Sequence, residues 1–199
     1  MLVETHQEIT REPVVFGHAL ETLLAEAEVL APHTLDALAR LGLSPLHPLD
    51  VAYPAEVWSE ALRILVQALS ADLGTAATEF LLGQRYAERA LRSRIGSALN
   101  AHARVVGPER TLMRTARNLR MANNFIDATV RELPDGKGWE LVTRPLQPFG
   151  GRGMPSMDPP HFQRGALSRD LEAAGAPGVR MELVEHDAAR GTARFHVFF

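Results

Sequence analysis

Four arginines in the middle of the chain are spaced so that they could bind an anion together. At about 100° per residue, Arg110, Arg114, Arg117 and Arg120 fall on one side of a helix predicted over residues 108–123, and apolar residues fall on the other side. Guanidinium groups bind carboxylates and phosphates through paired N–H donors. This stripe is our candidate contact for an acidic ligand or partner. The alternative is a solvated helix face.

The eight histidines do not form a recognisable metal motif. No two of them stand at HxxH or HExxH spacing. The chain has no cysteine, which excludes disulfides, cysteine-bound zinc, iron–sulfur clusters and thiol catalysis. His102 is the candidate axial ligand if the chain binds haem, and an ordinary, partly exposed side chain otherwise. We therefore predict no metal and no cofactor, with haem as the alternative.

No group of residues in the sequence matches a known catalytic arrangement. A serine nucleophile on a strand-to-helix turn requires a G-x-S-x-G motif, which is absent. We therefore expect a non-catalytic protein. An enzyme of unrecognised type is the alternative.

Aromatic residues on predicted helix faces are candidates either for a ligand pocket or for the core. They are Trp58, Phe80, Tyr86 and Phe125. Their positions on faces expected to be buried favour the core. We nevertheless keep Trp58 and Tyr86, together with the arginine stripe, as candidate contacts for a ligand or partner.

Charge is distributed unevenly along the chain. Residues 1–75 contain eleven carboxylates and three arginines, a net charge of −8, whereas residues 85–120 contain nine arginines and two glutamates, a net charge of +7. Packing of the two regions against each other is the simplest interpretation, either within one chain or between two chains of a homodimer. A surface for an acidic partner is the alternative. Nucleic acid is not expected, because the whole chain has a net charge of −3 and the basic stretch has no interleaved aromatics.

The elements that position these residues change in kind near residue 124. Apolar spacing before it predicts an edge strand or extended arm over 9–16 and helices over 17–30, 34–41, 54–73, 75–96, 97–106 and 108–123. After it, alternating residues predict one hairpin around Asp135-Gly136 and another around residues 187–191. A helix over 158–174, capped by Asp158, separates the two hairpins.

The predicted fold class is α+β. A mostly helical part, residues 1–124, packs with a C-terminal antiparallel sheet of ββαββ order in residues 125–199. A length of 199 residues suits one domain, 1–199. No apolar run approaches the roughly 18 residues of a membrane span, and the N-terminus does not resemble a signal peptide. We expect a cytoplasmic protein that does not contact a membrane.

Several short motifs resemble a large paralogous family of unknown function from myxobacteria. They fall at residues 15–23, 41–43, 48–54, 107–110 and 165–167. The family pattern places a Gly-Tyr pair where this chain has Arg85-Tyr86, and a terminal Trp where it has Phe199. The resemblance implies no activity and no functional residues.

The order of elements also resembles, more distantly, the fold of haem nitric-oxide sensors, vinyl-reductase-like domains and vesicle-tethering subunits. The Tyr-x-Ser-x-Arg motif with which such sensors hold haem propionates is absent. Our leading hypothesis is a non-catalytic regulatory or sensory module that binds a small apolar or anionic ligand or a protein partner. A sensor that binds haem or another cofactor is the alternative.

Overall fold

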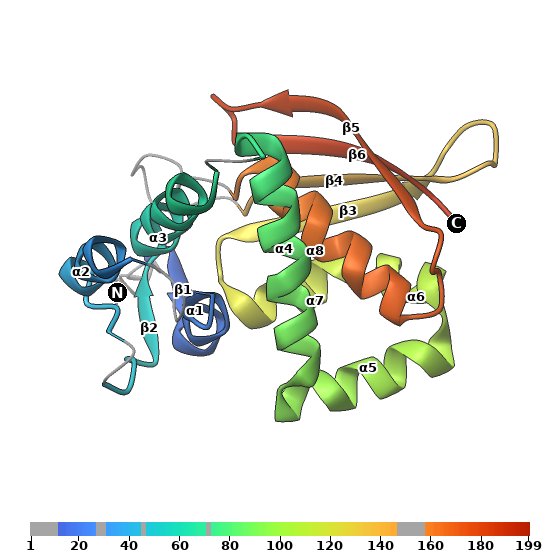
Figure 1. Cartoon of the computed structure of the whole chain (residues 1–199). Coiled ribbons are helices and arrows are strands. Elements are labelled where there is room, and N and C mark those ends of the chain that lie inside the picture. Colours follow the sequence, from blue (N-terminus) through green and yellow to red (C-terminus); the bar gives the residue numbers. More distant parts are fainter. Residues whose placement is uncertain (1–11, 27–30, 45–46, 71–72, 147–157) are drawn as a thin grey trace, which may run out of the picture.

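The computed structural model describes residues 12–26, 31–44, 47–70, 73–146 and 158–199. Its N-terminal part consists of three helices and a two-stranded antiparallel sheet at one side of the molecule (Figure 1). The elements are β1 (Val14–Phe16), α1 (Gly17–Leu24), α2 (Pro32–Arg40), β2 (Ala52–Pro54) and α3 (Ala55–Leu69). A strand at residues 52–54 was not predicted, because these residues form a strand only by pairing with β1.

The central part consists of α4 (Thr75–Arg92), α5 (Arg94–Val106), α6 (Pro108–Met113) and α7 (Thr115–Ala122). The predicted boundary near Gly96 is wrong, because the chain turns at Ser93, whose hydroxyl caps α5 by accepting from the Gly96 N–H. The single helix predicted over 108–123 is also wrong. Arg114, with φ −94° and ψ 2°, separates α6 from α7.

The C-terminal part is a four-stranded antiparallel sheet in the order β3-β4-β6-β5. Its strands are β3 (Ile126–Glu132), β4 (Trp139–Pro145), β5 (Arg180–Asp187) and β6 (Thr192–Phe198), and α8 (Pro160–Ala173) lies between β4 and β5 in the sequence. Both predicted hairpins are present. The α+β prediction is confirmed.

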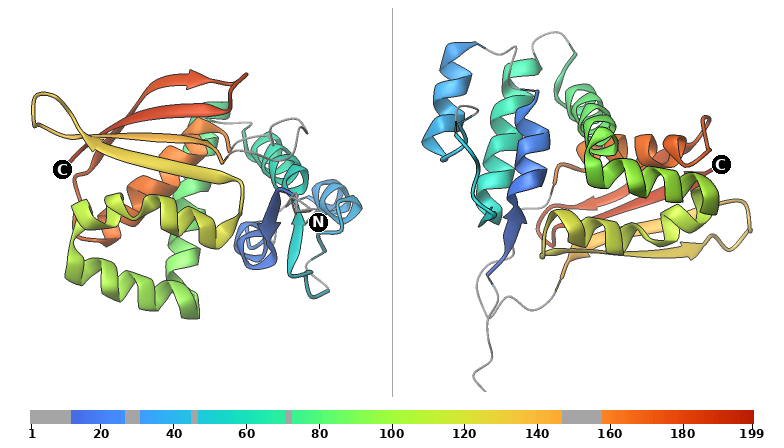
Figure 2. Two further views of the ribbon diagram at one scale, coloured as in Figure 1. Left: turned by 180° about the vertical axis from the view of Figure 1, so that it is seen from behind. Right: turned by 90° about the horizontal axis from the view of Figure 1, so that it is seen from below.

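Helices α7 and α8 lie against the sheet, α4 crosses α8, and the N-terminal helices lie to one side of them (Figure 2). Glycines permit this crossing. A Cβ at Gly83 of α4 would overlap the carbonyl oxygen of Phe162, and a Cβ at Gly165 of α8 would overlap that of Phe80. The two helices are therefore in backbone contact, which any side chain at these positions would prevent.

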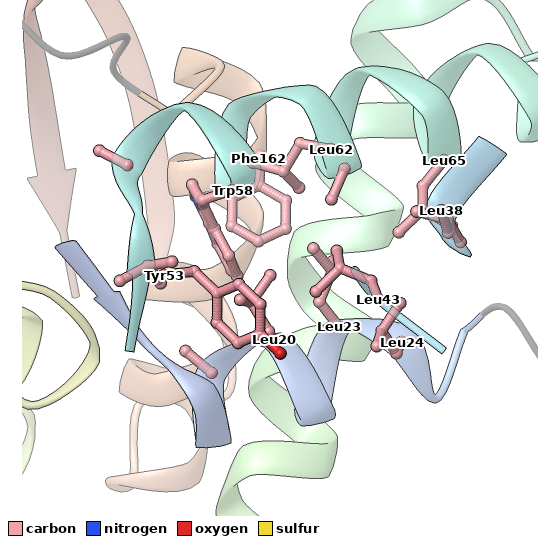
Figure 3. Packing of buried hydrophobic residues seen from close by; sticks show 14 of the residues in the cluster. Leu20, Leu23, Leu24, Leu38, Leu43, Tyr53, Trp58, Leu62, Leu65 and Phe162 are labelled. Carbon is pink, nitrogen blue, oxygen red and sulfur yellow. The ribbon is translucent and has the colours of Figure 1, made fainter. Parts of the chain in front are cut away.

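Two apolar clusters stabilise the structure. The first lies among the N-terminal helices and includes Leu20, Leu23, Leu62 and Trp58 (Figure 3). The second lies between the sheet and its helices and includes Leu141 and Phe195. No helix in the described part of the chain is long and apolar enough to cross a membrane.

Among the described residues, an ion pair at Glu26 joins the acidic and the basic region within one chain. Glu26, just after α1, is 6% exposed and accepts a hydrogen bond of 2.7 Å from Arg89 Nε. Arg85 Nη1 lies 3.5 Å from the same carboxylate. Two arginines of α4 thus neutralise a buried acid of the N-terminal part.

Candidate functional site

Three aromatic rings from different helices meet where α3, α4 and α8 come together. Trp58 of α3 lies 5.7 Å from Tyr86 of α4 and 6.0 Å from Phe162 of α8, and Tyr86 lies 5.5 Å from Phe162, measured between ring centroids. Figure 3 shows Trp58 beside Phe162. Trp58 and Phe162 are buried and Tyr86 is half-buried. The structure thus brings together two predicted ligand contacts, Trp58 and Tyr86, and adds Phe162.

The carboxylate of Asp158 lies beside the Trp58 ring. Trp58 Nε1 donates a hydrogen bond of 2.5 Å to Asp158 Oδ1. Burial raises the pKa of Asp158 to about 6, against the lowering effect of the Trp58 hydrogen bond. The predicted helix-capping role of Asp158 is wrong, because the N-cap position of α8 is Pro159 and the carboxylate binds Trp58 instead.

A second carboxylate lies on α8, 12 residues after Asp158 in the sequence. Asp170 of α8 is half-buried, and burial raises its pKa to about 7, while the nearby Arg169 acts in the opposite direction. Burial also raises the pKa of Tyr86, and the charges of Asp158 and Asp170 raise it further. Both carboxylates therefore lie within electrostatic range of the Tyr86 hydroxyl. We call Trp58, Tyr86, Phe162, Asp158 and Asp170 the aromatic–carboxylate seam.

The seam combines aromatic rings with carboxyl groups whose pKa values are raised. Burial disfavours the charged form of a carboxyl group, and carboxyl groups with raised pKa values are frequent at functional sites. Aromatic faces beside carboxylates suit a cationic or hydrogen-bond-donating group.

The four predicted arginines are all exposed and do not reach the seam. Arg120 donates to Asp127 at 2.8 Å, and Arg114 contacts His102. In the part of the chain that the structure describes, no hydrogen bond or ring contact joins any of the four to Trp58 or Tyr86. The helix break at Arg114 also divides the predicted stripe between α6 and α7.

His102 does not fit the role of a haem ligand. Its side chain is exposed on α5, and its Nε2 atom, which would bind the iron, contacts the guanidinium of Arg114. Close backbone contact at Gly83 and Gly165 leaves no room for a porphyrin between α4 and α8. The described residues also contain no group of three acids or histidines placed to hold a metal ion.

The sequence analysis missed the functional potential of Phe162, Asp158 and Asp170. One signal was available, because Phe162, Ala166 and Asp170 recur every four residues and therefore lie on one face of α8. The proximity of Asp158 to Trp58 carried no such signal. The two residues are 100 positions apart and meet only in the folded chain.

Comparison with known proteins gives a family and a fold. A family model described as a protein of unknown function (DUF2378) matches residues 13–197. No curated protein matches the sequence. Solved structures are similar over most of the chain at low identity. An Fe(II) unliganded mutant of the H-NOX protein from K. algicida has a TM-score of 0.56 and 14% identity, with 92% of this chain and 95% of that chain covered.

Two further structures give the same result. One, described as modulating haem redox potential through protein-induced porphyrin distortion, has a TM-score of 0.53 and 11% identity, covering 92% of this chain and 97% of that chain. Another, on the mechanism of H-NOX activation, has a TM-score of 0.51 and 12% identity, covering 91% of each chain. The distant fold resemblance to haem sensors is confirmed, and at these identities it concerns the fold alone.

Proposed function

Because the chain belongs to this family of proteins of unknown function, its activity has to be argued from its own residues, and we propose a non-catalytic sensory module that binds a small molecule at the aromatic–carboxylate seam. Its fold neighbours include H-NOX proteins, which supports a sensory role by analogy. We place the module in the cytoplasm.

One observation carries the proposal. The side chains of Tyr86 and Asp170 are half-buried, burial raises the pKa of both groups, and neither side chain has a hydrogen-bond partner in the described part of the chain. Polar groups that are partly removed from water usually have hydrogen-bond partners. A ligand with N–H or O–H donors would supply them.

The seam also restricts the chemistry of the ligand. Asp158 and Asp170 repel anions, whereas the rings of Trp58, Tyr86 and Phe162 attract organic cations through their negative faces. The ligand we propose is therefore a small molecule with an apolar body and an amine or another donor group. An anionic ligand fits the exposed arginines better than the seam.

The position of the seam explains how binding would be transmitted. Trp58 belongs to the N-terminal part, whereas Tyr86 and Phe162 belong to the crossed pair of helices α4 and α8. A ligand that contacts all three rings would change how α3 lies against α4 and α8. Haem is not part of this proposal, because His102 does not fit it.

The test uses a Trp139→Phe variant, in which Trp58 is the sole tryptophan. We would titrate it with 2-phenylethylamine and, as matched controls, with neutral 2-phenylethanol and anionic phenylacetate, and follow Trp58 fluorescence. We expect saturable quenching by the amine, at least tenfold weaker binding of phenylacetate, and loss of amine binding in Asp158→Asn and Asp170→Asn. Equal responses to amine and phenylacetate, or amine binding that persists in both variants, would refute the proposal.

A further inference from the structure

The helix α5 exposes an apolar face instead of burying it. None of the residues from Ser97 to Val106 is buried. Leu99 is 41% exposed and Val105 is 85% exposed. On a helical wheel both lie within about 60° of His102, so all three residues belong to one face. An amphipathic helix whose apolar side is not covered is unusual, because burial of that side provides most of the stability of a helix in a protein.

The neighbouring helix α6 continues this face with both apolar and basic side chains. Met113 is 55% exposed, and Arg110 and Arg114 are exposed one turn apart. The Arg114 guanidinium contacts His102 and so connects the two helices. We call Leu99, His102, Val105, Arg110, Met113 and Arg114 the α5–α6 surface. It lies at the edge of the molecule away from the open face of the sheet (Figure 1).

The basic charge of this surface is not neutralised within the chain. Of the nine arginines in residues 85–120, four are paired with a carboxylate: Arg85 and Arg89 with Glu26, Arg92 with Glu88, and Arg120 with Asp127. Arg110 and Arg114, in contrast, form no ion pair with any carboxylate of the described residues. Arg114 instead contacts the imidazole ring of His102. Carboxylates of a partner would neutralise both arginines.

A hollow adjoins Arg110. It has a volume of about 300 Å³ and lies where α5 meets α6, next to the end of β6. Its lining residues are Val106, Gly107, Pro108, Glu109, Arg110 and Phe199. The 48% exposed ring of Phe199 forms one apolar wall. A hollow of this size accommodates one or two apolar side chains of a partner.

We propose that the α5–α6 surface binds an acidic amphipathic helix of another protein. Such a helix would place leucine-like side chains against Leu99, Val105 and Met113, and carboxylates against Arg110 and Arg114. A nucleic acid would leave the apolar side chains without a partner. A membrane would require a larger apolar face than these three side chains provide. This proposal is independent of a ligand at the seam, which involves other residues.

The experiment measures binding of a labelled 18-residue amphipathic helix of Glu, Leu and Ala to the full chain by fluorescence anisotropy at 50 mM NaCl. The same peptide with Lys in place of Glu is the matched ligand control. The test variant is Arg110→Glu with Arg114→Glu. The matched protein control is Arg40→Glu with Arg144→Glu, since both arginines are exposed on α2 and β4 and the change in net charge is identical.

We expect the acidic peptide to bind at least tenfold more tightly than the basic one. The test variant should weaken this binding at least tenfold, the control variant less than threefold, and Val105→Ser, which keeps all charges, at least threefold. Equal losses in the two charge-reversed variants would overturn the proposal, because they would indicate only overall charge. Binding of anionic phospholipid vesicles without peptide binding, or a dimer in sedimentation analysis that Arg110→Glu with Arg114→Glu dissociates, would assign the surface to a membrane or to a second copy instead.

Discussion

Replacement of Asp158 by Asn should stabilise the protein at neutral pH and leave its stability unchanged in acid. Burial raises the pKa of Asp158 from 3.8 to about 6, so the folded protein holds this proton more tightly than the unfolded chain does. Each pKa unit corresponds to about 1.36 kcal/mol. The charged carboxylate therefore destabilises the folded state by about 3 kcal/mol above pH 6. Well below pH 3.8 the carboxyl is neutral in both states and this effect disappears.

The asparagine retains an amide oxygen that can accept the Trp58 hydrogen bond, so the substitution removes the charge and little else. Urea unfolding, followed by far-UV circular dichroism at pH 4, 5, 6 and 7.5, gives the free energy of unfolding of both proteins. We expect their free energies of unfolding to differ by about 0.5 kcal/mol at pH 4 and by about 3 kcal/mol in favour of Asp158→Asn at pH 7.5. Most of the change should fall between pH 4 and pH 6.

Asp36→Asn is the matched control, because Asp36 is exposed on α2 and the change in charge is the same. The free energy of unfolding of Asp36→Asn should remain within about 0.5 kcal/mol of that of the unsubstituted protein at every pH. A second check uses Trp58→Phe, which removes the hydrogen bond that lowers the pKa of Asp158. This variant should titrate Asp158 above pH 6 in a carboxyl-detected NMR experiment. If Asp158→Asn is less stable at pH 7.5, or if the difference does not vary with pH, the carboxylate is not buried as the structure indicates.

Three further changes test the fold and its charges. Gly83→Ala should destabilise the protein by about 3 kcal/mol in urea unfolding, because its Cβ would overlap the Phe162 carbonyl; an unchanged midpoint would refute backbone contact between α4 and α8. Glu26→Gln should lower the free energy of unfolding by about 1–2 kcal/mol, because Arg85 and Arg89 would lose their buried counter-charge. Glu21→Gln is the exposed control, and an equal loss of stability in both variants would refute a stabilising ion pair at Glu26. Asp170→Asn should stabilise the protein most strongly above pH 7, where the carboxyl is charged, and a loss of stability there would contradict its burial.

Local sequence patterns correctly predicted the elements whose secondary structure depends on residues close in the sequence. Both hairpins followed from alternation and turn residues, and the first of them has Gly136 in the left-handed region, with φ 67°. The helix ends at Ser93 and Arg114 were missed because helical spacing continues through them. At Ser93, capping by a hydroxyl outweighed the apolar pattern. Strand β2 was missed because its partner, β1, lies about 40 residues earlier in the sequence.

The candidate site was predictable only in part, because some of its residues meet only through contacts between distant parts of the sequence. Trp58 and Tyr86 were identified because large aromatics on apolar helix faces must pack against something. Their acidic neighbours were not, since a carboxylate is expected at the surface unless the fold removes it from water. The arginine stripe was predicted on a single helix. Because the helix breaks at Arg114, the four arginines do not lie on one continuous helix face. The break placed Arg114 against His102 and left Arg120 to pair with Asp127.

The packing of the seam indicates which of its parts can move. Helices α4 and α8 meet through backbone atoms at Gly83 and Gly165, and two backbones in contact cannot slide past each other without losing that fit. Helix α3 reaches the seam through the side chain of Trp58, which can change rotamer at much smaller cost. A ligand that replaces the bond between Trp58 and Asp158 would therefore displace α3 and the N-terminal part, and leave the crossed pair of helices α4 and α8 in place.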